Sequence, residues 1–93
     1  MPYYEPSGAV SVGIASTFLL PDNAFRRRIL FINDSLTTIY LRKGSPAIVG
    51  SGIRLNASGG NYEDLPDTRG YIYTGVWTAI TTVAAQNLAY TEE

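Results

Sequence analysis

The sequence contains neither cysteine nor histidine. These two absences exclude thiol nucleophiles, disulfide bonds, zinc sites built from cysteine and histidine, and histidine general bases. No coherent set of carboxylates and nucleophiles elsewhere in the sequence replaces them. We therefore expect a protein that is not an enzyme and that uses no cofactor or metal ion.

Net charge and long apolar runs are also scarce. The formal net charge is -1, with 7 basic and 8 acidic residues among 93, so nothing global favours nucleic acid or an anionic membrane as a partner. No apolar run approaches the roughly 20 residues of a membrane-spanning helix. The opening residues, MPYYEPSG, lack the basic segment and apolar run of a secretory signal. We expect no membrane association, and nucleic-acid binding is not favoured.

The sequence does contain enough hydrophobic residues for one small core. They make up 45% of the chain, which is ordinary for a globular protein and too high for a disordered one. We expect residues 9–93 to form a single domain. Residues 1–8 contain two prolines and the adjacent Tyr3 and Tyr4, and we expect an extended N-terminal arm there. This arm is a candidate interface, although a frayed terminus would explain the same composition.

Short alternating or β-branched stretches indicate strands, and no segment has a sustained helical period. The expected strands are Ala9 to Leu20, Phe25 to Asn33, Thr37 to Arg42, Ala47 to Val49, Ile53 to Leu55, a piece beginning at Tyr62, Tyr71 to Tyr73, Val76 to Ile80, and Gln86 to Thr91. Thr81 to Ala85 is expected to be a turn or a short helical stretch. The pattern predicts an all-β fold, a small antiparallel β-sandwich or barrel of about seven short strands.

Two polar stretches resemble ligand sites at first sight. The glycine-rich segment IVGSGIRLNASGGN lacks the Lys-Ser/Thr ending and the helix of a P-loop, and Leu55 stands where a dinucleotide fingerprint has its third glycine. We interpret Gly50 to Gly52 as a bend or bulge in which glycine permits a positive φ. Glu63, Asp64 and Asp67 match no calcium motif, and we interpret them as a solvated acidic turn.

Arg26, Arg27 and Arg28 form the densest positive charge. Alternate residues of a strand point to opposite faces, so three consecutive arginines do not form one flat patch. We interpret them as a solvated strand end or as salt-bridge partners of neighbouring subunits. Weak contact with nucleic acid is the alternative.

Tyrosine is abundant, and Trp77 is the only tryptophan. Aromatic residues are enriched both in sheets and at interfaces. We interpret Tyr71, Tyr73 and Trp77 as core and interface residues. A carbohydrate-binding face is the alternative use of the same three side chains.

The segment RRRILFINDSLTTIYLRKGSPAIVGSGIRLNASGGNYE, followed by GYIYTGVWTAI, resembles a small β-domain of tailed-bacteriophage virion proteins. The resemblance covers roughly residues 26–80, and it leaves the first 25 outside. The matching positions are Arg28 to Asn33, Ile39 to Leu41, Gly52 to Leu55, Gly59 to Glu63, and Gly75 to Ile80. These are strand and turn residues without a catalytic signature, so the resemblance implies a structural role in a virion.

The expected function is therefore that of a capsid decoration (cementing) protein, made in the host cytoplasm, that binds and stabilises the assembled phage head. Its partner would be the major capsid protein or another virion subunit. Small β-folds have strand edges that must be paired or covered, so a homo-oligomer is expected, with a trimer favoured. A neck, tail or head-fibre component, including a receptor- or carbohydrate-binding module, is the alternative.

Overall fold

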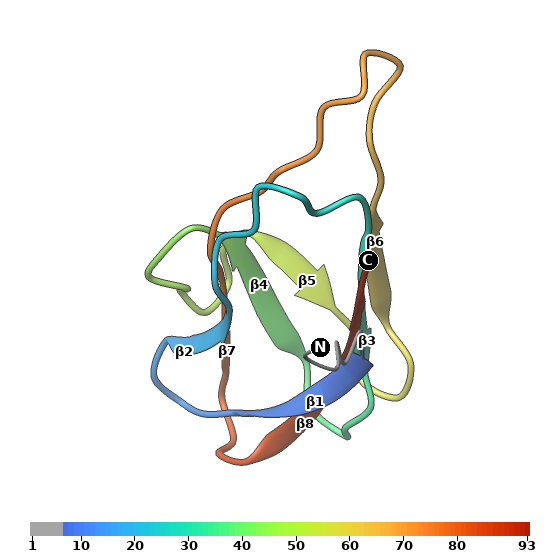
Figure 1. The fold of residues 1–93 in the computed structure, drawn as a ribbon. Coiled ribbons are helices and arrows are strands. Elements are labelled where there is room, and N and C mark those ends of the chain that lie inside the picture. Colours follow the sequence, from blue (N-terminus) through green and yellow to red (C-terminus); the bar gives the residue numbers. More distant parts are fainter. Residues whose placement is uncertain (1–6) are drawn as a thin grey trace, which may run out of the picture.

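The computed structural model describes residues 7–93. They form two four-stranded sheets that face one another, and every neighbouring pair of strands is antiparallel (Figure 1). The strands are β1 (Ser7–Val12), β2 (Thr17–Leu20), β3 (Ile29–Asn33), β4 (Ile39–Lys43), β5 (Ile53–Leu55), β6 (Asn61–Asp64), β7 (Trp77–Thr81) and β8 (Gln86–Glu92). The described residues contain no helix. The predicted all-β sandwich is confirmed.

The strand order defines the topology. One sheet has the order β1-β8-β3-β6 and the other the order β2-β7-β4-β5. Every connection except the β4–β5 hairpin therefore crosses from one sheet to the other. Eight strands in this order form a jelly roll. Four short connections, after β1, β3, β5 and β7, lie at one end of the sandwich, and the loops after β2, β4 and β6 lie at the other.

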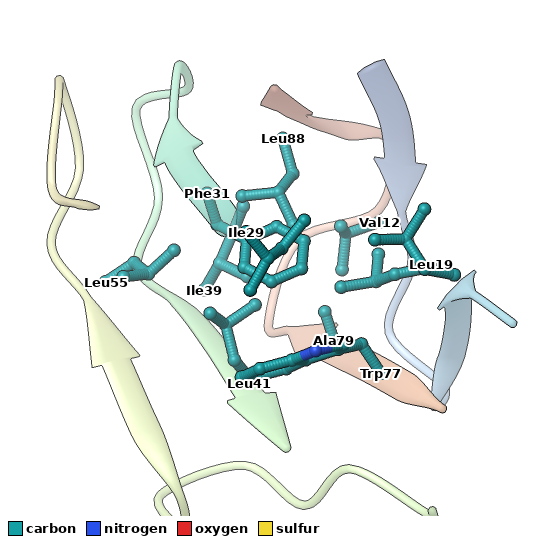
Figure 2. Packing of buried hydrophobic residues seen from close by; sticks show 11 residues of the cluster. Val12, Leu19, Ile29, Phe31, Ile39, Leu41, Leu55, Trp77, Ala79 and Leu88 are labelled. Atoms are coloured by element: carbon teal, nitrogen blue, oxygen red, sulfur yellow. The ribbon is translucent and has the colours of Figure 1, made fainter. Parts of the chain in front are cut away.

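The core lies between the sheets and is built around Trp77 of β7. This side chain is 0% exposed, and its ring meets that of Phe31 edge to face with 5.0 Å between the centroids. Aliphatic side chains from both sheets complete the core (Figure 2): Val12, Leu19, Leu20, Ile29, Ile39, Leu41, Leu55 and Leu88. Since Trp77 and Phe31 come from opposite sheets, their contact joins the two layers.

The expected strand from Ala9 to Leu20 is two strands in different sheets. The Gly13 N–H donates to Oγ1 of Thr17 at 3.0 Å, and the same hydroxyl donates to the carbonyl of Ala15 at 3.0 Å. These bonds close a turn between β1 and β2. The register of β2 shifts between Phe18 and Leu20; Phe18 is exposed, and the consecutive Leu19 and Leu20 are both buried. Period-2 alternation continues through this turn in the sequence and so hides it.

Two further expected strands are absent. Ala47 to Val49 lies in the β4–β5 loop, where the Ala47 N–H donates to Oγ of Ser16 at 2.8 Å instead of joining a ladder. Tyr71 to Tyr73 lies in the β6–β7 loop. The expected strand from Phe25 also begins later, at Ile29.

The turns follow expectation more closely. Gly50 and Gly52 have φ values of 82° and 88°, as the bend interpretation requires. A Cβ at Gly52 would collide with the carbonyl oxygen of Leu41. Residues 82–85 form a turn rather than a helical stretch.

Of the expected arm, residues 7 and 8 belong to β1. Ser7 pairs with Thr91 and Gly8 with Tyr90. The candidate interface residues Tyr3 and Tyr4 lie outside the described residues.

Candidate interaction site

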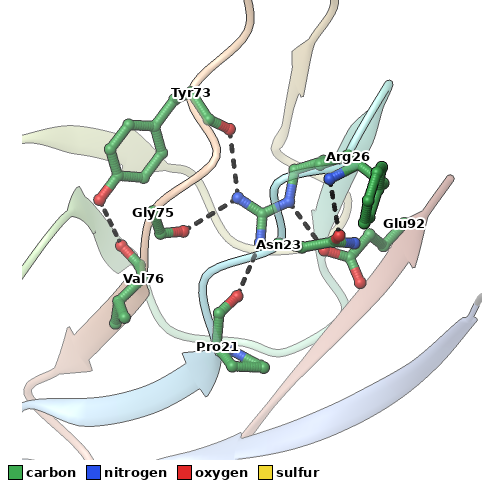
Figure 3. A network of polar contacts seen from close by, with 8 residues as sticks. Pro21, Asn23, Arg26, Tyr73, Gly75, Val76 and Glu92 are labelled. Atoms are coloured by element: carbon green, nitrogen blue, oxygen red, sulfur yellow. Dashed lines mark hydrogen bonds and ion pairs between the residues drawn. The ribbon is translucent and has the colours of Figure 1, made fainter.

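Arg26 connects the β2–β3 and β6–β7 loops, which lie at the same end of the sandwich. Its side chain is fully buried, and its guanidinium donates four hydrogen bonds (Figure 3). Nε donates to Oε2 of Glu92 at 2.7 Å. One terminal nitrogen donates to the carbonyls of Tyr73 and Gly75 at 3.2 and 2.9 Å, and the other donates to the carbonyl of Pro21 at 2.9 Å. A buried charge is tolerated when it is paired and its donors are used. Arg26 is paired with Glu92, and four of its five N–H donors are used.

These bonds connect three segments that are far apart in the sequence. Pro21 belongs to the β2–β3 loop, Tyr73 and Gly75 to the β6–β7 loop, and Glu92 to the last strand. The Asn23 N–H adds a fourth link, to the carbonyl of Thr74 at 2.7 Å. The two loops are therefore held as one rigid unit.

The base of the β6–β7 loop has a further internal bond. The Tyr73 hydroxyl donates to the carbonyl of Val76 at 2.8 Å (Figure 3). A Cβ at Gly75 would collide with that hydroxyl, so glycine is the residue that fits beside the ring.

The tip of the β6–β7 loop is ordered by Asp67. Its Oδ1 accepts from the N–H groups of Arg69 and Tyr71 at 2.8 and 3.0 Å, and its own N–H donates to the Tyr71 carbonyl at 2.9 Å. The Arg69 guanidinium lies 5.3 Å from the centre of the Tyr71 ring, within cation–π range. Figure 1 shows this loop, in orange, extending from the top of the sandwich.

The clamped loops expose large apolar side chains to solvent. Phe25, on the β2–β3 loop, is 88% exposed, and Tyr71, on the β6–β7 loop, is 67% exposed. The Phe25 N–H donates to Oδ1 of Asn23 at 3.0 Å, which fixes the backbone beside the exposed ring. We call Phe25, Leu65, Arg69 and Tyr71 the docking end. Aromatic and arginine side chains of this kind dominate protein–protein interface energies.

The three consecutive arginines have three different environments. Arg26 is 2% exposed, so its interpretation as an interface residue is wrong. Arg27 is exposed, as expected. The Arg28 side chain is 30% exposed, and its Nε donates to Oε2 of Glu63 at 2.6 Å. This hydrogen bond, together with the charges of Glu63 and Glu93, raises the pKa of Arg28 against the opposing effect of burial.

Tyr71, Tyr73 and Trp77 do not form the exposed face that the alternative of carbohydrate binding requires. Trp77 is buried, and the Tyr73 ring packs edge-on against it with 5.7 Å between the centroids. Lys43 places its ammonium within 6.0 Å of the Tyr62, Tyr73 and Trp77 rings. Of the three expected residues, only Tyr71 is exposed. Trp77 is a core residue, and Tyr73 is a partly buried residue that packs against the core.

The acidic residues separate as well. Glu63 pairs with Arg28, Asp64 lies 3.5 Å from Lys43, and Asp67 forms the loop tip. They therefore form ion pairs and a turn, not one solvated acidic cluster. Among residues 7–93, no group of three His, Cys, Asp or Glu residues is placed to hold a metal ion. No helix in this part of the chain could span a bilayer.

The opposite end of the sandwich has a shallow hollow of about 380 Å³. It is lined by Asp34, Ser35, Leu36, Ser58 and Gly59. The single hydroxyl proton of Ser35 has two acceptors in reach of Oγ, Oδ1 of Asn33 at 2.6 Å and the Thr37 carbonyl at 3.0 Å. This serine is engaged in closing the β3–β4 turn.

Sequence reasoning missed several residues of this site. Phe25 was assigned to a strand, whereas it projects from a loop next to the turn residue Asn23. Arg69 and Glu92 received no role. Arg26 and Glu92 are 66 positions apart, and no local pattern indicates that they pair.

The comparisons with known proteins found no matching family model, no similar curated protein and no similar solved structure. The resemblance to phage virion domains therefore stays a prediction.

Proposed function

We propose that this protein is a non-enzymatic structural component of a tailed-phage virion that binds the assembled head and stabilises it. The observation that carries the proposal is the docking end. Its loops are fixed by the buried guanidinium of Arg26, so the exposed Phe25 and Tyr71 lose little conformational freedom when they bind. A rigid surface of this kind suits a protein that works by adding interface area.

Two further observations support a virion role. The residues that carry the resemblance fall mainly on β3 to β7 and their turns, where they shape the fold. The jelly roll is an architecture used by viral capsid domains, and also by lectins and cupins. A shared fold does not imply a shared function, so the argument rests on the docking end.

The mechanism is one of linkage. A protein that binds the assembled shell, and not its separated subunits, stabilises the shell by RT ln(1 + [L]/Kd). The partner is then the major capsid protein. A neck, tail or head-fibre position would use the same docking end on another virion subunit.

Carbohydrate recognition has less support. Stacking on a sugar needs an exposed aromatic face, whereas Trp77 is buried and Tyr73 is partly buried against it. Of the three residues considered for such a face, Tyr71 alone is exposed.

The proposal is tested by binding the purified protein to capsids that lack it, with sedimentation of the particles and measurement of bound protein. We expect saturable binding at a fixed ratio. Phe25→Ser and Tyr71→Ser should each weaken it at least about 10-fold, because central aromatic anchors contribute about 2 kcal/mol or more.

The matched control is Leu36→Ser. Leu36 has the same 88% exposure as Phe25, but it lies in the β3–β4 turn at the opposite end. Its substitution should leave binding unchanged. If the unaltered protein fails to bind capsids, or if Leu36→Ser weakens binding as much as Phe25→Ser, the proposed docking end is wrong.

A further inference from the structure

The two sheets leave four strand edges, on β1, β6, β2 and β5. An exposed edge offers unpaired backbone groups to any other strand, and proteins usually protect it with charges, bulges or a very short strand. Three of these edges have such protection. β5 is three residues long and contains Arg54, β6 contains Glu63 and Asp64, and β2 has four residues and a register shift.

β1 has none of these features. It is the longest edge strand, with six residues, SGAVSV, that include no charge and no proline. All six positions pair with β8 in an unbroken register. Ser7, Gly8, Ala9 and Ser11 are exposed, so no other described segment covers this strand.

The side chains of β1 also favour close approach. Gly8 lies against the Tyr90 ring, where a Cβ would come within 2.9 Å of the hydroxyl. On the outer face, Ser7, Ala9 and Ser11 stand beside Thr91, Ala89 and Asn87 of β8. These six residues are uncharged, and none is a bulky side chain that would obstruct a neighbouring strand.

We propose that β1 is a homodimerisation edge, which pairs antiparallel with β1 of a second copy around a two-fold axis. The joined sheet would have the order β6-β3-β8-β1-β1-β8-β3-β6. A second copy is the matching occupant because its edge is equally long and neutral, so no like charges face each other. A two-fold contact also closes on itself instead of forming a fibre.

The segment of β1 that could pair with a second copy is bounded on both sides. Pro6 precedes β1 and has no N–H for a ladder. The turn that begins at Gly13 follows it. The proposal goes beyond the function above, and it gives a dimer where the sequence alone favoured a trimer.

The test uses the protein alone, without capsids. A negative result would therefore contradict the dimer and not the proposed function. Sedimentation equilibrium over a concentration series should show a monomer–dimer equilibrium. Ala9→Lys should raise the dimer dissociation constant at least about 10-fold, because lysine on an edge opposes pairing. Asn87→Lys is the control, since it adds the same charge to the same face on the internal strand β8. It should leave the constant within about 3-fold.

Single cysteines give an independent measurement, because the chain has none of its own. Ser7→Cys, Ala9→Cys and Ser11→Cys are oxidised alone and in pairwise mixtures. Antiparallel pairing brings one variant, one mixture, or both Ala9→Cys and the mixture of Ser7→Cys with Ser11→Cys into register. A sample in register should form interchain disulfides at least about 10-fold faster than Asn87→Cys. A monomer at every concentration, a dimer unaffected by Ala9→Lys, or equal cross-linking from Asn87→Cys would overturn the proposal.

Discussion

At the residue scale, Arg26 shows how one side chain stabilises several loops at once. Lysine cannot replace it, because a single ammonium does not reproduce the planar fork of donors. Loss of that fork removes the Arg26 donors from the Glu92 carboxylate and from three backbone carbonyls. Unpaired buried acceptors are costly.

We expect Arg26→Lys to lower the free energy of unfolding by about 3 kcal/mol, within the range for a broken buried ion pair. Urea titration followed by tryptophan fluorescence measures the change. Arg27→Lys, at the exposed neighbouring position, should stay within about 0.5 kcal/mol. Equal midpoints for the two variants would mean that Arg26 does not stabilise the loops.

Two glycines of one loop provide a second matched pair. Gly50 and Gly52 both have positive φ, but a Cβ at Gly50 meets nothing within 4 Å, whereas one at Gly52 meets the Leu41 carbonyl. Gly50→Ala should cost about 1 kcal/mol from backbone strain alone. Gly52→Ala should cost clearly more, because β4 and β5 must move apart. Thermal unfolding compares the two, and equal melting temperatures would contradict the collision.

At the element scale, the sequence predicts a strand well where one face is buried in regular alternation. β3 and β4 alternate in burial in this way, and the sequence predicts both to within a few residues. The pattern fails where the decisive hydrogen bond comes from a distant residue. The Tyr73 carbonyl accepts a hydrogen bond from the Arg26 guanidinium, and the Ala47 N–H donates one to Oγ of Ser16. Neither partner is visible in the local sequence, so both segments were wrongly assigned to strands.

The end of β8 is a structural element rather than a dispensable tail. The Glu93 carbonyl accepts from the N–H groups of Arg27 and Arg28 at 2.6 and 2.9 Å, and Glu92 pairs with Arg26. Removal of both glutamates should therefore lower the unfolding free energy by about 3 kcal/mol or more, although terminal residues usually tolerate deletion. Urea titration measures the loss.

Glu93→Gln is the control for that truncation. It keeps the backbone bonds and removes a charge that is 3.7 Å from Arg28 on an exposed pair, so its effect should be within about 0.5 kcal/mol. If the truncated chain is as stable as Glu93→Gln, the last two residues do not clamp the loops.

At the scale of the whole molecule, the sandwich depends on one shared aromatic cluster. Trp77, on β7 of one sheet, contacts Phe31 and Tyr62 of the other sheet and Tyr73 of the β6–β7 loop. Trp77→Ala should therefore cost about 3–5 kcal/mol, a large fraction of the stability of a domain of this size.

Hydrogen exchange measured by mass spectrometry checks this prediction. Amides of β3 and β7 should lose protection together, because a small single domain unfolds as one unit. Phe18→Ala, at an exposed position of β2, should leave protection in both strands unchanged. Loss of protection in one sheet alone would show that the cluster does not couple the layers.

The β7 strand runs from one end of the sandwich to the other. It begins directly after the clamped β6–β7 loop and ends at Thr81, which pairs with Ile39 and leads into the exposed turn of residues 82–85. A foreign peptide inserted between Val83 and Ala84 would thus be carried on the side away from the docking end. If the docking end holds the particle, the protein becomes a carrier that displays inserted antigens or enzymes outward on a phage surface.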